Sequence, residues 1–268
     1  MHRRHLGVVS ALARYPVKSM RGEALDEALI TERGVTGDRE WALCETTYGG
    51  VMSARAWPAM LDLRAAWAGD PALADDAARG AARVRIEMPG GAIVEAGAPE
   101  AAGALSAYLR RTVRFERIRR ERLTPAELEA IMRGEAVAPR RDFYDEEVIH
   151  LLASGTLDHL RSLAGGAADF DPRRFRANLL VDTGRDIAPG FLEDQWLEGA
   201  IEIGGELRIV GMRPALRCAI TTHPQAELPH NPAILRTAWN HHRAYVGLFA
   251  AVGTPGTIRI GDAVVLTD

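Results

Sequence analysis

Short apolar runs and alternating apolar and polar positions fill the first half of the chain, from about residue 6 to residue 117. Alternation with a period of two, bounded by turn-forming residues, is typical of half-buried strands. Residues 96–111 are the exception, because they are alanine-rich and carry Leu105 and Leu109 at helical spacing. The pattern predicts a β-rich first half with one helix near its end. The turns expected between its strands are at Gly34, Gly37, Gly49-Gly50, Pro58 and Pro89-Gly90-Gly91.

A second helix and a linker are predicted in the middle of the chain. Thr124-Pro125-Ala126-Glu127 combines a capping threonine, a proline at the first helical position and a glutamate three residues after the threonine. This helix is expected to end near Gly134. Residues 134–147 show no periodicity, which is typical of a linker. We therefore expect two domains, residues 1–134 and residues 135–268.

Predicted strands and helices alternate in the second half. Two helices are expected, at 156–163 and from Asn231-Pro232 to about 243, where the proline can occupy the first turn. Gly204-Gly205 between two short apolar segments predicts a hairpin. The chain is thus expected to be mainly β with α, in the α+β class. Its expected strands here are 148–153, 178–182, 201–203, 206–211, 246–252 and 257–266.

Composition excludes several classes of protein. The 268 residues are 47% hydrophobic and 26% charged with a formal net charge of −3, so no electrostatic footprint for nucleic acid is present. No run of 18 apolar residues occurs, and no membrane span is expected. Two cysteines without metal-type spacing argue against a disulfide framework or a zinc site, and favour a reducing compartment, the cytoplasm. The basic residues 1–5 and apolar residues 6–13 resemble a signal peptide only in part, because the run is short and cleavage would cut a predicted strand.

Cys218 is the first candidate for chemistry, since it directly follows Arg217 in the stretch Pro214-Ala215-Leu216-Arg217-Cys218-Ala219-Ile220. A neighbouring guanidinium favours the thiolate, which is the form of cysteine that attacks electrophiles or binds soft metals. The alternative is that Cys218 is a small core residue in a strand. The local sequence does not decide between the two.

Positive charges also lie beside glycines at the ends of predicted strands. Lys18 and Arg39 stand in such places, where backbone amides and cations together can form a cradle for an anion. Ordinary turns with exposed cations are the alternative. Residues 171–178 pack three arginines before a strand, although a solvated basic face is the commoner cause of such a run. The acids of residues 191–196 either solubilise a loop or face a pocket.

Together these segments resemble the MOSC family, and the resemblance spans essentially the whole chain. The first half is similar to the β-barrel domain that accompanies MOSC domains, through Tyr15-Pro16-Val17-Lys18-Ser19 and Gly37-Asp38-Arg39-Glu40-Trp41. The second half is similar to the MOSC domain itself, named for the carboxy-terminal part of molybdenum cofactor sulfurase. Its matching pieces are Leu151-Leu152-Ala153-Ser154-Gly155-Thr156-Leu157, Arg174-Phe175-Arg176-Ala177-Asn178-Leu179, Phe191-Leu192-Glu193-Asp194-Gln195-Trp196, Arg217-Cys218-Ala219-Ile220-Thr221-Thr222 and Gly261-Asp262.

The resemblance implies a molybdenum cofactor between the two domains, and pyridoxal phosphate is not expected. The family's molybdenum-ligating cysteine falls on Cys218, whose soft thiolate suits the metal. Asp194 is expected near the metal, as an orienting group or proton donor. Cys44 matches no family cysteine and is expected in the core. The residues expected to bind the cofactor are Lys18, Ser19 and Arg39 from the first half, and Ser154, Thr156, Arg176, Asn178 and Arg217 from the second.

The implied activity is that of a molybdenum-dependent oxidoreductase, similar to the mitochondrial amidoxime-reducing component and its bacterial relatives. Such enzymes reduce small N-hydroxylated compounds: amidoximes, hydroxylamines and N-hydroxylated bases. Some bacterial relatives carry an iron–sulfur domain at the carboxy terminus that is not present here, so a separate iron–sulfur or haem carrier and its reductase are expected to supply electrons. The alternatives are a non-catalytic carrier of the cofactor, or of sulfur as a Cys218 persulfide, and a binding module that has lost its cofactor.

One turn departs from the family pattern. His223-Pro224-Gln225 stands where the family usually has an acidic residue and proline after the paired threonines. With His241 and His242, His223 could line a substrate entrance. A histidine in such a place is more often an ordinary surface or core residue.

Overall fold

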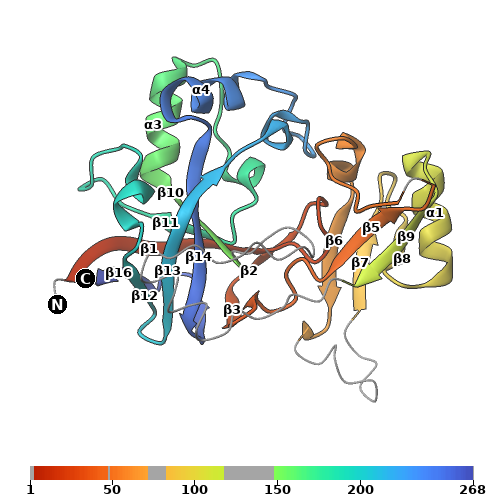
Figure 1. Ribbon diagram of the computed structural model, residues 1–268, viewed down its shortest axis with the longest axis horizontal. Coiled ribbons are helices and arrows are strands. Elements are labelled where there is room, and N and C mark those ends of the chain that lie inside the picture. Colours follow the sequence, from red (N-terminus) through yellow and green to blue (C-terminus); the bar gives the residue numbers. More distant parts are fainter. Residues whose placement is uncertain (1–2, 48, 72–82, 118–147, 268) are drawn as a thin grey trace.

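The computed structural model describes residues 3–47, 49–71, 83–117 and 148–267. Strands make up most of the regular structure, and three α-helices lie at the periphery of the described chain (Figure 1). The expected fold class, mainly β with α, is confirmed. Within the described ranges, no helix is both long and apolar enough to cross a membrane.

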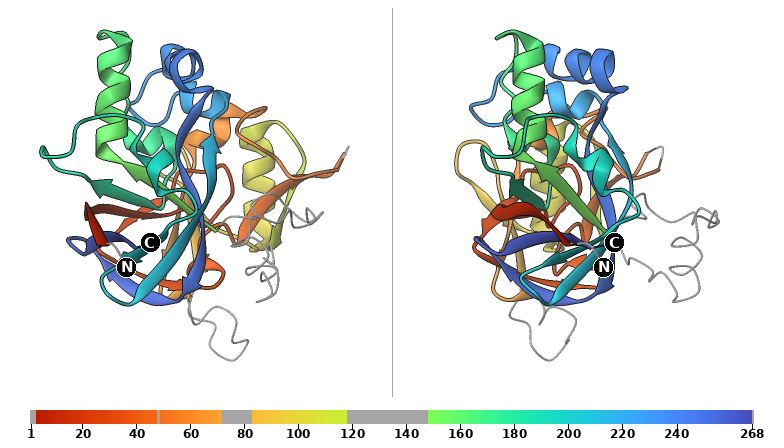
Figure 2. Two further views of the ribbon diagram at one scale, coloured as in Figure 1. Left: turned by 60° about the vertical axis from the view of Figure 1, so that its left-hand side comes forward. Right: turned by 90° about the vertical axis from the view of Figure 1, so that its left-hand side faces the viewer.

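Seven strands close into a barrel, in which β1 pairs with β16 on one side and with β11 on the other. β10 and β11 run parallel, and the other neighbours in the barrel are antiparallel. Figure 2 shows this ring of strands from two further sides. Its strands, in order, are β11 (Leu179–Asp182), β10 (Ile149–Ala153), β14 (Tyr245–Thr254), β13 (Leu207–Leu216), β12 (Ala200–Ile203), β16 (Ala263–Thr267) and β1 (Arg3–Arg14), and β2 (Glu23–Leu25) pairs with β1 outside the ring.

Alternating side chains fill the barrel. In β13, Leu207 and Ile209 are buried and Arg208 between them is exposed, which is the period of two expected of a strand with one wet face. β10 is buried on both faces. Its Leu151 points into the barrel core and Leu152 joins a second cluster outside the barrel.

Closure of the barrel requires a glycine in β1. The register of β1 on β16 shifts between His5 and Gly7, and Gly7 has a φ of +138°. A Cβ atom at this position would lie 2.0 Å from the carbonyl oxygen of Asp182 in β11. Only glycine permits the close approach that lets β1 contact both neighbours.

Two helices cover the outer face of the barrel at β10. These are α3 (Ser154–Ala164) and α4 (Ala233–His242), which pack with the 3-10 helix η3 (Pro172–Phe175). The apolar cluster between them and the barrel contains Leu152, Leu157, Leu160, Phe170, Phe175, Ile234 and Val246. This layer holds in place the segment that follows η3.

The first half builds a second core beside the barrel (Figure 1). Ile220, from the 3-10 helix η5 (Ala219–Thr222), packs against this core although it belongs to the second half. The elements of the second core are β5 (Trp41–Glu45) with β9 (Val113–Arg117), β6 (Arg64–Ala68) with β7 (Arg83–Glu87) and β8 (Ile93–Glu95), α1 (Pro99–Leu109) and η1 (Pro58–Asp62). A third small sheet joins β3 (Glu27–Thr31), β4 (Gly34–Val35) and β15 (Gly256–Arg259).

Most expected elements are found close to their predicted bounds. The helix expected within 96–111 is α1, and those expected at 156–163 and 231–243 are α3 and α4. The hairpin at Gly204-Gly205 joins β12 to β13. Cys44 is buried in β5, as expected. The helix predicted from Thr124 and the linker 134–147 lie outside the described residues, so the domain division at 134/135 stays a prediction.

Candidate functional site

Three arginines from distant parts of the chain converge around Tyr15. The guanidinium carbon of Arg176 lies 4.3 Å from the centre of the Tyr15 ring, and that of Arg39 lies 5.2 Å from it. Arg217 is close enough to act electrostatically on both Tyr15 and Arg176. We call Arg39, Arg176 and Arg217 the arginine cluster. It joins the end of β1, the turn before β5 and the segments after η3 and β13.

The backbone around the cluster is held in a conformation that most residues avoid. Ser19, Arg39 and Arg176 have φ values of 65°, 51° and 55°, in the left-handed region. A non-glycine residue there costs about 1–3 kcal/mol and persists only where the surroundings fix it. Such residues concentrate at functional sites, so their grouping here favours a binding role over an ordinary turn.

A turn of the first half is tied directly to Arg176. The guanidinium of Arg176 donates a hydrogen bond to the carbonyl oxygen of Met20, which follows Lys18 and Ser19. The amide of Lys18 donates to the Trp41 carbonyl oxygen at 2.8 Å, and this anchors the turn to β5. Ser19 is buried and Lys18 is half-buried. The structure therefore places the turn that carries Lys18 and Ser19 next to Arg176, and their predicted role in binding a cofactor stays a prediction.

Asn178 links the two halves of the chain through hydrogen bonds next to the arginine cluster. Its side-chain oxygen accepts from the His150 amide at 3.1 Å and from Arg39 at 3.4 Å, and its side-chain nitrogen donates to the Ala13 carbonyl oxygen at 3.2 Å. Arg39 also donates to the Arg176 carbonyl oxygen at 3.2 Å and pairs with the buried carboxylate of Asp38. In this structure the Asn178 amide therefore positions the arginine cluster. Its predicted contact with a cofactor stays a prediction.

Burial and like charges disfavour the charged form of Arg176. Arg176 is 8% exposed, and burial together with the charges of Arg39 and Arg217 lowers the pKa of its guanidinium to about 10. Burial, with Arg217 and Arg39 next in importance, holds the pKa of His150 well below its ordinary value, so that imidazole is neutral. Burial raises the pKa of Tyr15, which keeps that phenol neutral too. No carboxylate within the described ranges lies at ion-pair distance from Arg176, so an anion bound here would offset a buried charge.

Cys218 lies where the second half meets the first. It follows β13, precedes η5 and is half-buried, with its carbonyl oxygen accepting from the hydroxyl of Thr221 at 3.0 Å. On one side, Arg217 donates to the Phe175 carbonyl oxygen at 2.6 Å. On the other, Ile220 packs into the first-half core. Cys218 is therefore a half-buried residue directly after Arg217 in the chain, at the start of η5, rather than a core residue in a strand.

Ser154 and Thr156 form a separate polar group at the start of α3. The Ser154 hydroxyl lies 3.2 Å from Asp182 and accepts from the Thr183 amide at 3.1 Å. Thr156 is fully buried, and its hydroxyl contacts the Glu193 carboxyl group and the carbonyl oxygen of Gly190, the latter at 3.0 Å. The described contacts of these two hydroxyls are thus to α3 and its surroundings. Their predicted role in binding the cofactor stays a prediction.

Asp194 pairs with a histidine of α4. Its carboxylate lies 2.8 Å from Nε2 of His242, whose Nδ1 lies 2.9 Å from the Tyr245 carbonyl oxygen. The ring of Phe191 stacks on His242 at 3.9 Å between centroids. The pair is therefore an oriented unit, and its place near a metal stays a prediction.

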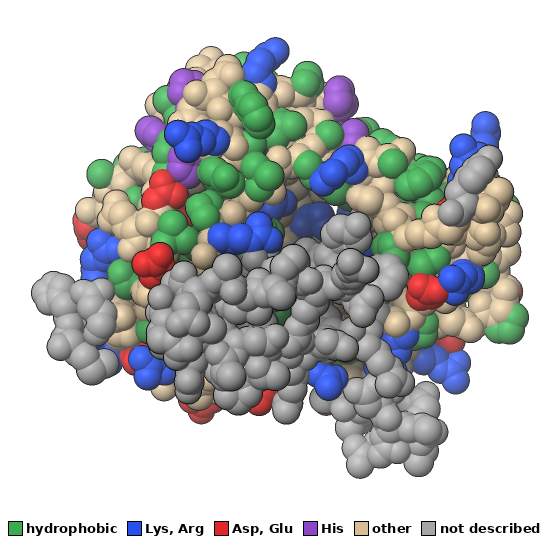
Figure 3. Space-filling view, viewed as in Figure 1, with side chains coloured by type: hydrophobic (Ala, Val, Ile, Leu, Met, Phe, Trp, Pro, Cys, Tyr) green, Lys and Arg blue, Asp and Glu red, His purple; other side chains and the backbone are tan. Residues whose placement is uncertain are grey.

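Three participants were not expected from the sequence. Tyr15 stood inside a recognised motif without a role, His150 precedes another motif, and Glu193 adjoins Asp194. The pattern of hydrophobic and polar positions does not show that a tyrosine is buried between cations, or that a histidine is buried beside them. In Figure 3, the face between the barrel and the first-half sheets is hollowed, and lysine or arginine side chains line the hollow.

Comparison with known proteins identifies the two domains of the chain. Residues 6–138 match the MOSC N-terminal beta barrel domain, and residues 138–265 match the MOSC domain. The crystal structure of the YUAD protein from Bacillus subtilis aligns over 99% of this chain and 97% of its own, with 11% identity and a TM-score of 0.52, which shows a shared fold. YiiM from Geobacillus stearothermophilus aligns over 46% of this chain and 55% of its own, with 19% identity and a TM-score of 0.32. No curated protein matches the chain.

The two family matches follow one another and together run from residue 6 to residue 265. They cover both the arginine cluster and Cys218. The chain therefore belongs to the MOSC family, as a MOSC domain preceded by a MOSC N-terminal β-barrel domain.

Proposed function

We propose that this protein is a molybdenum cofactor-dependent oxidoreductase that reduces small N-hydroxylated compounds, such as amidoximes, hydroxylamines and N-hydroxylated bases. The observation that supports it most is the arginine cluster, drawn from both halves, with the half-buried Cys218 directly after Arg217 in the chain. A cationic cradle together with a soft ligand matches a cofactor that carries both a phosphate and a metal. Membership of the MOSC family supports molybdenum cofactor as that group.

The residues present fit such a group. Arg176 is a buried cation whose described hydrogen bond goes to a neutral carbonyl oxygen, so a phosphate would supply the missing counter-charge. Cys218 offers a thiolate ligand of the softness that molybdenum requires. When bound, the cofactor would supply the two-electron redox chemistry.

The chain's own residues would bind and orient. In this proposal Lys18, Ser19 and Arg39 hold the phosphate from the first half, while Arg176 and Arg217 contact the cofactor from the second. Asn178 fixes Arg39 against the barrel. The neutral ring of Tyr15 lies between the cations without adding a negative charge. Ser154 and Thr156 are assigned to the cofactor on the family match alone.

Reduction of an N-hydroxyl group to an amine and water consumes protons as well as electrons. The Asp194 carboxylate lies 2.8 Å from Nε2 of His242, and we assign to this pair the delivery of protons toward the reacting group. A separate iron–sulfur or haem carrier with its reductase would deliver the electrons. The two free thiols, Cys44 and Cys218, agree with a reducing compartment, and we place the protein in the cytoplasm.

The test is to purify the protein from a host that makes molybdenum cofactor, then to measure molybdenum per chain and reduction of a hydroxylamine with an artificial electron donor. Cys218→Ser replaces a soft thiolate by a hard hydroxyl, so turnover and the metal's spectroscopic signature should both be lost. Cys44→Ser is the matched control, because serine can still donate to Glu116 as the buried Cys44 thiol does at 2.9 Å.

Two results would contradict the proposal. Normal turnover by the Cys218→Ser protein would remove this residue from the metal site. Release of cofactor, or of sulfur from Cys218, to an acceptor protein without substrate reduction would instead identify a carrier.

A further inference from the structure

A cavity of about 320 Å³ lies next to the arginine cluster. It opens where the strand end of β1 and the turn before β2 face the segments around η3 and after η5. Tyr15 and Arg176 line it from the cluster side. Lys18, Ser19, Arg39, Arg217 and Cys218 are not among the residues that line it, so the cavity adjoins the proposed cofactor site without coinciding with it.

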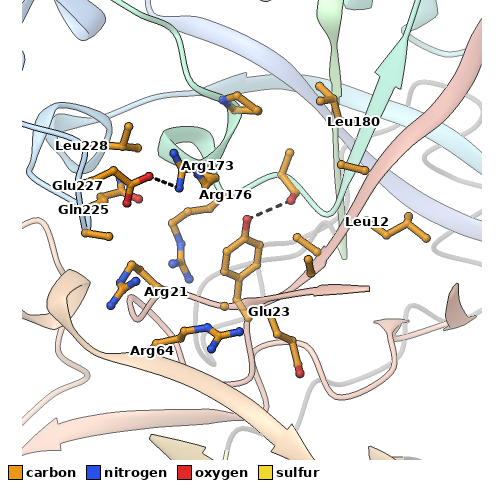
Figure 4. Close-up of a pocket in the computed structure, with 18 residues that line it drawn as sticks. Leu12, Arg21, Glu23, Arg64, Arg173, Arg176, Leu180, Gln225, Glu227 and Leu228 are labelled. Atoms are coloured by element: carbon orange, nitrogen blue, oxygen red, sulfur yellow. Dashed lines mark hydrogen bonds and ion pairs between the residues drawn. The ribbon is translucent and has the colours of Figure 1, made fainter. Parts of the chain in front are cut away.

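One end of this cavity is cationic. Figure 4 shows the guanidinium groups of Arg21, Arg64 and Arg176 gathered on the same side. Arg21 donates to the carbonyl oxygens of Leu61 and Asp62 at 2.9 and 3.0 Å, and Arg176 donates to a carbonyl oxygen as well. These acceptors are neutral and leave the charges of Arg21 and Arg176 in place.

The acids around the cavity are already engaged. Glu23 accepts from Arg14 at 2.8 Å and from the Trp67 amide at 3.1 Å, and Glu227 pairs with Arg173 at 2.6 Å. Arg64 lies 3.6 Å from Glu87, but both side chains are about half exposed and water screens that pair. The three guanidinium groups therefore carry more positive charge than the described carboxylates offset.

The other end is apolar. Leu12 and Leu180 lie opposite the cations in Figure 4, and alanine residues of β1 and of the segment after η3 continue the wall. We propose that the cavity binds a small amphipathic anion, with a phosphate or carboxylate group on Arg21 and Arg64 and a compact apolar body against Leu12 and Leu180. A planar guanidinium pair suits either anion, because each can accept two parallel hydrogen bonds.

This site does not rest on the proposed function, since its anion is assigned to Arg21 and Arg64, which the cofactor does not use. Occupation of the cavity would nevertheless reach the cofactor site, because Arg176 and Tyr15 belong to both. The ligand is therefore placed to change how tightly the arginine cluster holds its own anion.

Calorimetric titration of the full chain with phenyl phosphate tests the proposal, in the cofactor-free and the cofactor-loaded protein. Phenyl phosphate should bind both forms, and more tightly than inorganic phosphate, which lacks an apolar body, or benzyl alcohol, which lacks a charge. Arg64→Gln should weaken binding about ten-fold, which is typical of one lost charge-assisted hydrogen bond. The matched control is Arg85→Gln, an exposed arginine of β7 that does not line the cavity.

Three results would overturn the proposal. Equal affinity for phenyl phosphate in the Arg64→Gln and unchanged proteins would show that the cationic end does not bind the anion. Equal affinity for phenyl phosphate and inorganic phosphate would remove the apolar end. Complete loss of binding in the cofactor-loaded protein would show that the cavity is part of the cofactor site, and this result is separate from whether the loaded protein reduces hydroxylamine.

Discussion

Lys18 is the only lysine in a chain whose 33 basic residues are otherwise arginines. It stands in the turn that Arg176 ties to the second half. A lysine head is a compact, mobile charge, whereas arginine is a planar fork that prefers two parallel acceptors. The pattern of hydrophobic and polar positions does not distinguish this lysine from an arginine. The single lysine of the sequence is nevertheless the residue that we assign to the phosphate.

Lys18→Ala should weaken cofactor retention about ten-fold, because one charge-assisted contact is worth about 1.5–3 kcal/mol. Lys18→Arg keeps the charge and should retain more cofactor than Lys18→Ala. Molybdenum per chain after dialysis measures both. Reductive methylation with ¹³C-formaldehyde gives an independent readout, since Lys18 is the only side-chain amine, and its methyl signal should shift when cofactor binds. Full retention by Lys18→Ala with an unshifted signal would place the phosphate elsewhere.

Glu193 links stability to pH. It is buried against Thr156 and the Ala153 amide, and burial raises its pKa from 4.5 to about 7. Because the folded-state pKa lies above the unfolded one, the stability from the protonated carboxyl is complete below pH 4.5 and is lost as the pH rises through 7. The loss amounts to at most about 3–4 kcal/mol, at about 1.4 kcal/mol per pH unit between the two values.

Glu193→Gln should remove this loss, since the amide stays neutral and can still accept from Ala153. Its free energy of unfolding relative to the unchanged protein should increase between pH 5 and pH 8, as measured by urea denaturation. The low pKa of His150 acts in the opposite direction, but it is common to both proteins and cancels in the difference. A difference that is constant with pH would mean that Glu193 is ionised throughout.

At the scale of elements, the sequence predicted those turns whose conformation depends on the residues within them. The hairpin glycines Gly204 and Gly205 have φ values of 63° and 82°, which is why glycine marked that turn. The sequence did not decide whether Cys218 lies in a strand or in a turn, because its apolar neighbours suit both. In the structure, β13 ends at Leu216, and the first-half core receives Ile220, which no window of sequence could show.

Arg174 holds the segment that carries Cys218 in place through hydrogen bonds. Its buried guanidinium donates to the carbonyl oxygens of Thr221, His223 and Pro229 at 3.3, 3.2 and 2.7 Å. Arg174→Gln should cost about 2–4 kcal/mol in the free energy of unfolding, since glutamine cannot reach all three acceptors and leaves buried carbonyl groups unpaired.

Its neighbour Arg173 is the matched control. Arg173 forms exposed pairs with Asp171 and Glu227, so Arg173→Gln should cost less than about 1 kcal/mol. Chemical denaturation of the two variants side by side measures the contrast. Similar costs for both would mean that the segment after η5 is held by its apolar contacts instead.

At the scale of the whole molecule, the two halves of the sequence share their sheets. β1, from the start of the chain, lies between β16 and β11 of the second half, and β3 pairs with β15. The sequence predicted each of these strands, but pairing between ends of a chain is decided by non-local packing that the period of a strand does not encode. The same limit applies to the arginine cluster, whose members were expected together only through the family resemblance and whose convergence on Tyr15 was not expected.

The shared barrel makes a prediction about folding. Residues 148–267 alone lack β1, whose Leu6, Val9 and Leu12 belong to the barrel core, and they leave β11 and β16 as open edges. That fragment should show no cooperative unfolding and should aggregate.

Arg3 of β1 pairs with Thr267 of β16, and the two ends of the chain lie together in Figures 1 and 2, so a two-residue Asn-Gly turn can join residue 267 to residue 3. Appending residues 3–14 in this way should restore a cooperative urea transition, whereas the same appended strand with Val9→Asp should not, because it places a charge in the core. Cooperative unfolding of residues 148–267 without any appended strand would show that β1 completes the barrel but is not required to form it.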